Sequence, residues 1–126
     1  MDYKFACFTT GAVTLSTTAG GTVTQNISIE QDAPFECHYI TGLLLQANVI
    51  VTNWGGTVQI TDSRVNKGLF NNPIGFMEIA GDGRQPYPLK YPRLFAANST
   101  LVVAFTNNVV TAGTAQLTLH GFKVYN

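Results

Sequence analysis

The residues of this chain that could do chemistry are few and scattered. In the stretch ECH, Glu36 and His38 would share one face of a strand, where they could offer two metal ligands. A metal-dependent enzyme on a β fold needs several histidines and a carboxylate around one metal, and the chain has two histidines, His38 and His120. We therefore interpret His38 as a solvated or hydrogen-bonded residue, and we expect no enzyme activity, no metal and no cofactor.

Other short motifs give equally weak signals. The stretch GDG at 81–83 begins like a phosphate loop, but no lysine or helix follows it, so we interpret it as a turn. Glu30, Asp32 and Glu36 are close enough in sequence for a calcium loop, although a solvated acidic turn is the simpler interpretation. Cys7 and Cys37 are the only cysteines, and we expect two reduced thiols that behave as small hydrophobic residues.

The segment 80–93 combines stiffness with residue types that are common at protein interfaces. It carries three prolines and two tyrosines, and five of the seven basic residues of the chain lie between positions 64 and 93. Proline lowers the entropy lost on ordering, and tyrosine and arginine are enriched at interfaces. The three acids Glu30, Asp32 and Glu36 lie in another loop, so acids of a second copy could pair with these arginines. The sequence predicts a protein interface at Arg84, Tyr87, Lys90, Tyr91 and Arg93. The alternative, compatible with the first, is a strap that packs Tyr87, Leu89 and Tyr91 onto its own sheet.

Composition limits the classes of partner. The chain has 126 residues, enough for one domain, and charged residues make up 11% of it, with a net charge of zero. This balance argues against a nucleic-acid partner and favours self-association, which we expect as a homodimer or homotrimer. The start MDYKFACF lacks the features of a signal peptide, and no apolar run is long enough for a membrane helix, so we expect no membrane partner.

The elements that must position these residues are strands. Helical periodicity is almost absent, and Thr, Val, Asn and Gly predominate. Turn signals about every ten residues predict one all-β domain of about eight antiparallel strands over 13–126, with a jelly roll favoured over an immunoglobulin-like sandwich. Residues 35–52 would form two strands or one strand bent at a bulge, and the apolar pattern of the last strand slips at His120–Gly121. Residues 1–12 would form an N-terminal arm or an edge strand, with Tyr3, Phe5 and Phe8 as apolar contacts.

The carboxy-terminal half, roughly residues 57–125, resembles small structural proteins of tailed bacteriophages. The resemblance lies in the order of several short motifs, which are carried by Ile60, Asp62, Asn71, Pro73, Gly81, Gly83, Pro86, Pro88, Pro92, Leu101, Phe105, Asn107, Leu117, Gly121, Phe122 and Tyr125. It implies a jelly-roll protein of the virion, made in the host cytoplasm and located on the capsid surface. There it would serve as a cement or decoration protein that binds across major capsid protein subunits and stabilises the mature head.

The alternative role is a module of a tail or head fibre that binds carbohydrate of the host surface. Such a module needs exposed aromatic rings near carboxylates, and Trp54 on a turn and Tyr39 near Glu36 are the candidates.

Overall fold

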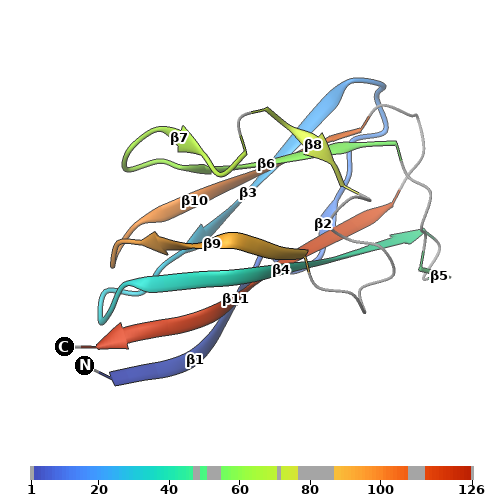
Figure 1. Cartoon of the computed structure of the whole chain (residues 1–126). Coiled ribbons are helices and arrows are strands. Elements are labelled where there is room, and N and C mark those ends of the chain that lie inside the picture. Colours follow the sequence, from blue (N-terminus) through green and yellow to red (C-terminus); the bar gives the residue numbers. More distant parts are fainter. Residues whose placement is uncertain are drawn as a thin grey trace.

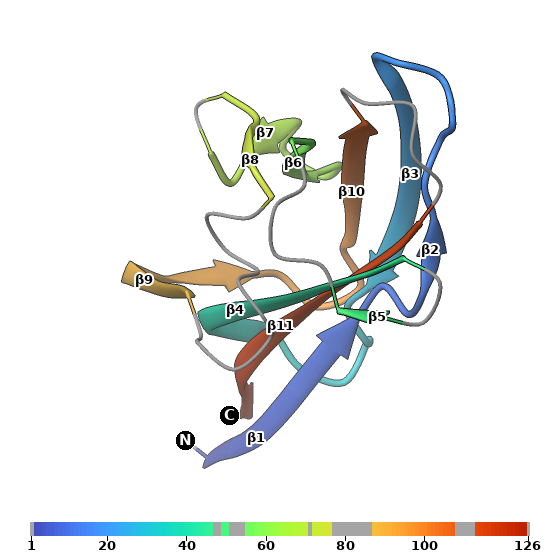
Figure 2. The ribbon, with the colours of Figure 1, turned by 90° about the vertical axis from the view of Figure 1, so that its right-hand side faces the viewer.

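A computed structural model describes residues 2–46, 49–50, 55–70, 72–76, 87–107 and 113–125. These residues form strands and turns without a helix, so the expectation of an all-β chain is confirmed. Two antiparallel sheets face each other in a sandwich-like arrangement (Figures 1 and 2). The strands are β1 (Asp2–Thr9), β2 (Val13–Thr14), β3 (Gly21–Ser28), β4 (Phe35–Gln46), β5 (Val49–Ile50), β6 (Thr57–Asp62), β7 (Lys67–Gly68), β8 (Ile74–Gly75), β9 (Tyr87–Phe95), β10 (Thr100–Asn107) and β11 (Thr114–Tyr125).

The first sheet is built around its two longest strands, β11 and β4, which pair antiparallel along most of their length. On its other side β11 pairs with β1 along one part of its length and with β2 along another. On its other side β4 pairs in the same way with β9 and with β5. The second sheet has the order β3-β10-β6-β7, and β8 also pairs with β6. Strand β1 therefore lies at an outer edge of the first sheet, as Figure 2 shows.

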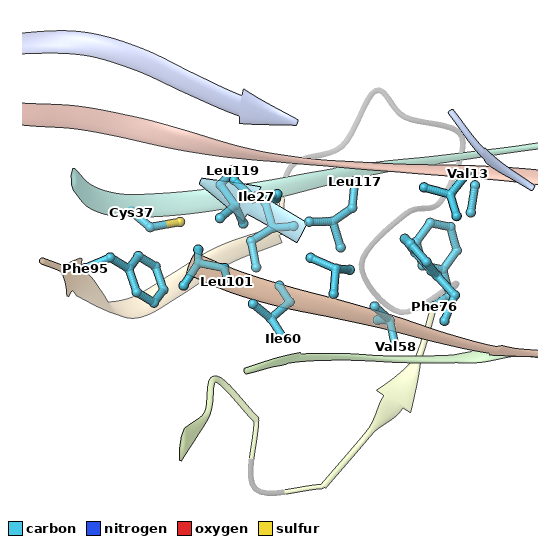
Figure 3. Close-up of a cluster of buried hydrophobic side chains, with 14 of the residues drawn as sticks. Val13, Ile27, Cys37, Val58, Ile60, Phe76, Phe95, Leu101, Leu117 and Leu119 are labelled. Carbon is cyan, nitrogen blue, oxygen red and sulfur yellow. The ribbon is translucent and has the colours of Figure 1, made fainter. Parts of the chain in front are cut away.

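The core fills the space between the two sheets, where inward side chains of both meet (Figure 3). Val58 and Ile60 of β6 are both fully buried, as the alternation of TVQITDS predicts. The fully buried phenylalanines are the largest side chains of the core, and each such ring contributes about 1.5–3 kcal/mol of transfer free energy. They are Phe35, Phe76, Phe95 and Phe105.

The bulge of the first sheet lies on β4. The pairing register does shift at His120–Gly121, as the sequence predicts, but burial in β11 alternates without a break from Ala115 to Lys123. The extra residue is His38, which is inserted between Cys37, paired with Gly121, and Tyr39, paired with His120. The apolar residues that suggested a slip in β11, such as Phe122, lie on the outer face of the sheet instead.

The proline-rich segment is more regular than the sequence predicts. The three prolines of 80–93 interrupt the apolar alternation, which predicts a loop there, but Tyr87–Phe95 forms strand β9. Its pairing with β4 jumps from Arg93, opposite Cys37, to Pro88, opposite Tyr39, so the residues between them form a wide irregularity. Proline is tolerated there because, among the described strands, β9 pairs with β4 alone and needs fewer amide donors than a central strand. Residues 77–86, which include Arg84 and the GDG stretch, lie outside the described residues, as does Trp54.

Candidate functional site

Strand β1 has one side toward the core and one toward solvent. Of the two alternatives for the N-terminal segment, the structure has the edge strand, because Asp2–Thr9 pairs residue by residue with β11. Phe8 points into the sandwich, where its ring lies 4.8 Å from that of Phe35. Tyr3 and Phe5 point outward and are 56% and 63% exposed. The three aromatic residues that the sequence predicts as contacts are therefore divided between the core and the surface.

Phe122 is the centre of an aromatic cluster on the outer side of the first sheet. Its ring centroid lies 6.4 Å from that of Tyr3, 6.1 Å from that of Phe5 and 5.3 Å from that of His38. All three contacts are edge-to-face, a favoured geometry for aromatic pairs. Leu94 of β9 belongs to the same side, because it is directly opposite Glu36 in the sheet, and it is 59% exposed. We define the aromatic face as Tyr3, Phe5, Glu36, His38, Tyr39, Leu94, His120 and Phe122.

His38 lies on the same side of β4 as Glu36, as its position two residues further along the strand predicts, and the bulge turns Tyr39 to this side as well. His38 Nε2 donates a 2.9 Å hydrogen bond to Glu36 Oε1, so the interpretation of His38 as a hydrogen-bonded residue is confirmed. Together with Tyr3 and Phe122 these two side chains line a shallow hollow of about 250 Å³. The aromatic face therefore contains one acidic depression surrounded by rings.

The second row of the aromatic face is a stack of Tyr39 on His120, with ring centroids 4.5 Å apart and planes 5° from parallel. His120 Nε2 lies 2.8 Å from Thr41 Oγ1, and its Nδ1 lies 3.2 Å from Cys7 Sγ. Burial raises the pKa of the Cys7 thiol and lowers the pKa of His120, so both groups are held neutral. A reactive cysteine needs the opposite shift toward thiolate, so this pair is a structural contact and not an activated nucleophile.

The predicted interface residues of β9 are divided in the same way as those of β1. Tyr91 is 76% exposed, and the exposed Lys90 places its Nζ 5.6 Å from the Tyr91 ring centroid. Tyr87 and Leu89 instead pack against the core, as the strap interpretation predicts for them, and Arg93 is half-buried. Of these predicted residues, Lys90 and Tyr91 are therefore the exposed ones, and Leu94 of the same strand is exposed as well.

The two acids of the loop between β3 and β4, Glu30 and Asp32, bind side chains of the same chain. Lys123 Nζ donates to Glu30 Oε1 at 2.6 Å and to Asp32 Oδ1 at 3.1 Å, and the Tyr125 hydroxyl donates to Asp32 Oδ2 at 2.7 Å. The expectation that these two acids would pair with arginines of another copy is therefore not supported by their geometry. Of the three acids singled out in the sequence, only Glu36 lies on the aromatic face.

Within the described part of the chain, no group of three or more His, Cys, Asp or Glu side chains is placed to hold a metal ion. Nor does this part contain a helix that is long and apolar enough to cross a membrane. Comparisons with protein-family models, with curated proteins and with solved structures found no match to the chain.

Sequence reasoning missed the residue at the centre of the aromatic face. Phe122 breaks the apolar alternation of the last strand, and we interpreted that break as a bulge. The alternative meaning of such a break is an apolar residue on the solvent side, which marks a contact surface when other exposed apolar residues adjoin it. The second signal was Phe5, which is directly opposite Phe122 in the β1–β11 pairing.

Proposed function

We propose that this chain is a virion structural protein, a jelly-roll cement or decoration protein that binds across major capsid protein subunits and stabilises the mature head. The observation that supports it best is the aromatic face, where Tyr3, Phe5 and Leu94 are each more than half exposed on the open side of one rigid sheet. Adjoining exposed apolar side chains of this kind typically mark an interaction surface. The resemblance of residues 57–125 to phage structural proteins supports the major capsid protein as the partner.

A small β protein without net charge meets the physical requirements of such a role. A protein that binds the assembled lattice and not free subunits stabilises the lattice by mass action, with no need of an active site. Its contact surface has to lose little entropy on binding. The rings of the aromatic face meet this condition, because they are ordered by contacts with Phe122 before any partner arrives.

Self-association is part of this proposal. Among the described strands, β1 pairs with β11 alone, so its other edge offers eight residues of backbone to a further strand. Pairing of two β1 edges would join two first sheets into one continuous sheet and give a homodimer. In this arrangement the aromatic faces of both copies would form one larger surface toward the capsid.

The test uses capsids that lack the protein, incubated with purified variants and sedimented. The double substitution Tyr3→Ser with Phe5→Ser should lower the amount that binds at a given concentration by about tenfold or more, because two central aromatic contacts are removed. The matched control is Val65→Ser. This residue is 53% exposed in the turn after β6, on the second sheet, and should bind as wild type does. Wild-type stoichiometry and affinity of the folded double variant would overturn the role of the aromatic face.

A second candidate function is binding of host-surface carbohydrate by a fibre module. The specific observation in its favour is the composition of the hollow beside Tyr3 and Phe122, where aromatic rings adjoin a carboxylate as such a module requires. A glycan array separates the two functions. Binding to a defined sugar that the Tyr3→Ser and Phe5→Ser changes abolish, without any binding to capsids, would favour the fibre module.

A further inference from the structure

The hollow on the aromatic face has the composition of a cation-binding site. It places one carboxylate, Glu36, among three ring systems, those of Tyr3, His38 and Phe122. The Glu36 side chain is 29% exposed, so it is partly withdrawn from water yet reachable from outside. His38 donates to one of its oxygens and thereby fixes the direction in which the carboxylate points.

The geometry of the rings favours a cation over a sugar. Tyr3 and His38 each meet Phe122 with their planes 89° apart, so the rings form walls at right angles and not one flat platform for a sugar to stack on. Ring faces attract cations, and the attraction grows as water is excluded. The carboxylate supplies a full negative charge for the same cation. Arginine suits both features, because its planar guanidinium stacks on rings and pairs with a carboxylate.

The size of the hollow points to a side chain of a partner and not to a free small molecule. Its volume of about 250 Å³ is smaller than the roughly 300–1,000 Å³ of typical ligand pockets. The hollow also lies in the middle of a surface with exposed apolar residues on either side, Phe5 and Leu94. A partner that covers this surface would place a side chain directly in the hollow and exclude water from it.

The two lysines next to Phe5 and Phe122 in the β1–β11 pairing form their contacts on the side of the sheet opposite Glu36. Lys4 and Lys123 pair with each other across β1 and β11, one position from Phe5 and Phe122, so they point to the opposite side of the sheet. Lys4 Nζ lies 5.6 Å from the Tyr125 ring centroid, and Lys123 binds Glu30 and Asp32. Their charges are directed away from the hollow.

We infer that the hollow of Tyr3, Glu36, His38 and Phe122 receives an arginine side chain of the protein that binds the aromatic face. The inference rests on the proposed function in one respect, that the partner of this face is a protein. It adds the chemistry of recognition: an apolar surface on the partner with an arginine at its centre, which Glu36 selects by charge.

The first experiment probes the hollow alone. Labelled protein is titrated with acetyl-arginine amide, and the chemical shifts of its backbone amides are followed by NMR. Acetyl-citrulline amide, which has nearly the same shape without the charge, and a methyl glycoside serve as comparison probes. We expect the arginine probe to shift residues on β1, β4 and β11 around the hollow, with the citrulline probe at least fivefold weaker. Equal binding of the arginine and citrulline probes, shifts located elsewhere, or preferential binding of the glycoside in the hollow would each overturn the inference.

The second experiment uses a substitution with a matched control. Glu36→Gln keeps an oxygen that can accept from His38 and removes the charge, and we expect it to weaken the arginine probe about five- to tenfold. Asp2→Asn removes the same charge from β1, on the side of the strand opposite Tyr3, and should leave the affinity unchanged. Loss of binding in both variants, or in neither, would contradict a specific role of Glu36.

The capsid assay separates this inference from the proposed function. If Glu36→Gln binds capsids as wild type does, although the Tyr3→Ser and Phe5→Ser double variant does not, the aromatic face binds capsid without an arginine in the hollow and the inference is wrong. If the wild-type protein binds the arginine probe but no capsid, the proposed function fails while the hollow keeps its arginine selectivity.

Discussion

Lys123 Nζ lies 2.6 Å from Glu30 Oε1, and this contact joins the end of β11 to the loop that connects β3 with β4. The lysine is buried, whereas the side chains of Glu30 and Asp32 are 63% and 48% exposed. The hydrogen bond to Glu30 is the main reason why the pKa of Lys123 is raised. The loop leads directly into Phe35 and the β4 bulge. The ion pair therefore fixes the start of the strand that carries Glu36 and His38 of the aromatic face.

Removal of this ion pair should destabilise the fold only moderately. For Lys123→Met, which keeps an apolar stem of similar length, we expect the free energy of unfolding to fall by about 1 kcal/mol, because both acids remain solvated. Lys90→Met is the matched control, since Lys90 is exposed on β9 and contacts the Tyr91 ring. The free energies of unfolding of both variants are measured by urea titration with fluorescence as the signal. A Lys123→Met protein as stable as the control would show that the ion pair makes no net contribution.

The hydroxyl of Tyr125 should make stability depend on pH in the acid range. Its hydrogen bond, followed by that of Lys123, lowers the pKa of Asp32. A lowered folded-state pKa contributes stability above the unfolded value of about 3.9, and the contribution is lost as pH falls through the folded value. Tyr125→Phe should therefore be less stable than wild type near pH 7, and the difference should shrink as pH falls below the unfolded value of the Asp32 pKa. Tyr91→Phe should show no such pH-dependent difference; a constant difference for Tyr125→Phe would indicate lost packing instead.

Gly121 should tolerate no side chain. A Cβ atom at this position would overlap the carbonyl oxygen of Glu36, a backbone atom of the neighbouring strand that cannot move without disturbing the bulge. We expect Gly121→Ala to cost about 3 kcal/mol of stability, at the upper end of overpacking effects. Gly55→Ala, with open space around the added methyl group, should stay within about 1 kcal/mol of wild type. Chemical denaturation of the two variants tests this, and similar midpoints would mean that β4 yields at the bulge.

The all-β class and most strand positions could be predicted because alternation reports burial directly. The alternation of TVQITDS places Val58 and Ile60 in the core, where the structure has them. For β9 the same rule fails, because Pro88 and Pro92 suppress the strand signal although an edge strand with an irregular pairing accommodates both. Sequence patterns describe one strand at a time, and they do not show that this proline-rich segment pairs with β4.

The candidate site could be predicted only in part for a similar reason. Tyr3 and Phe5 are visible in the sequence as apolar residues near the start of the chain. Their neighbours Glu36, His38 and Phe122 come from two other strands, and the register that brings them together is set by the extra residue in β4. A bulge of one residue changes which side chains share a face, and the local sequence ECHY does not reveal where it falls.

The two cysteines should differ sharply in reactivity. Cys37 is buried in the core, and burial raises its pKa to about 12, whereas Cys7 is exposed on β1. Because the thiolate is the reacting form, we expect the native protein to react with a thiol reagent at Cys7 only, and at both residues after denaturation. A Cys7→Ser variant should show no native reaction. Rapid reaction of both thiols in the native state would show that the core around Cys37 opens, and no reaction after denaturation would indicate a disulfide.

Phe5 and Phe8, three residues apart on β1, offer the sharpest separation of binding from stability. Phe8 packs against Phe35 in the core, and Phe5 contacts Phe122 on the outer side. For Phe8→Ala we expect a loss of about 2 kcal/mol in the free energy of unfolding, less than for a fully buried ring because Phe8 is only partly buried.

For Phe5→Ala we expect a loss of stability below about 1 kcal/mol, because its ring is mostly exposed and only one aromatic pair is removed. Capsid binding should change in the opposite order when it is measured at a temperature where both variants are folded. Phe5→Ala should bind about tenfold more weakly, because removal of a desolvated aromatic contact costs roughly 1–2 kcal/mol, and Phe8→Ala should bind as wild type does. If both variants lose stability and binding in proportion, β1 acts only as a strand of the sandwich, and its outer side makes no contact with the capsid.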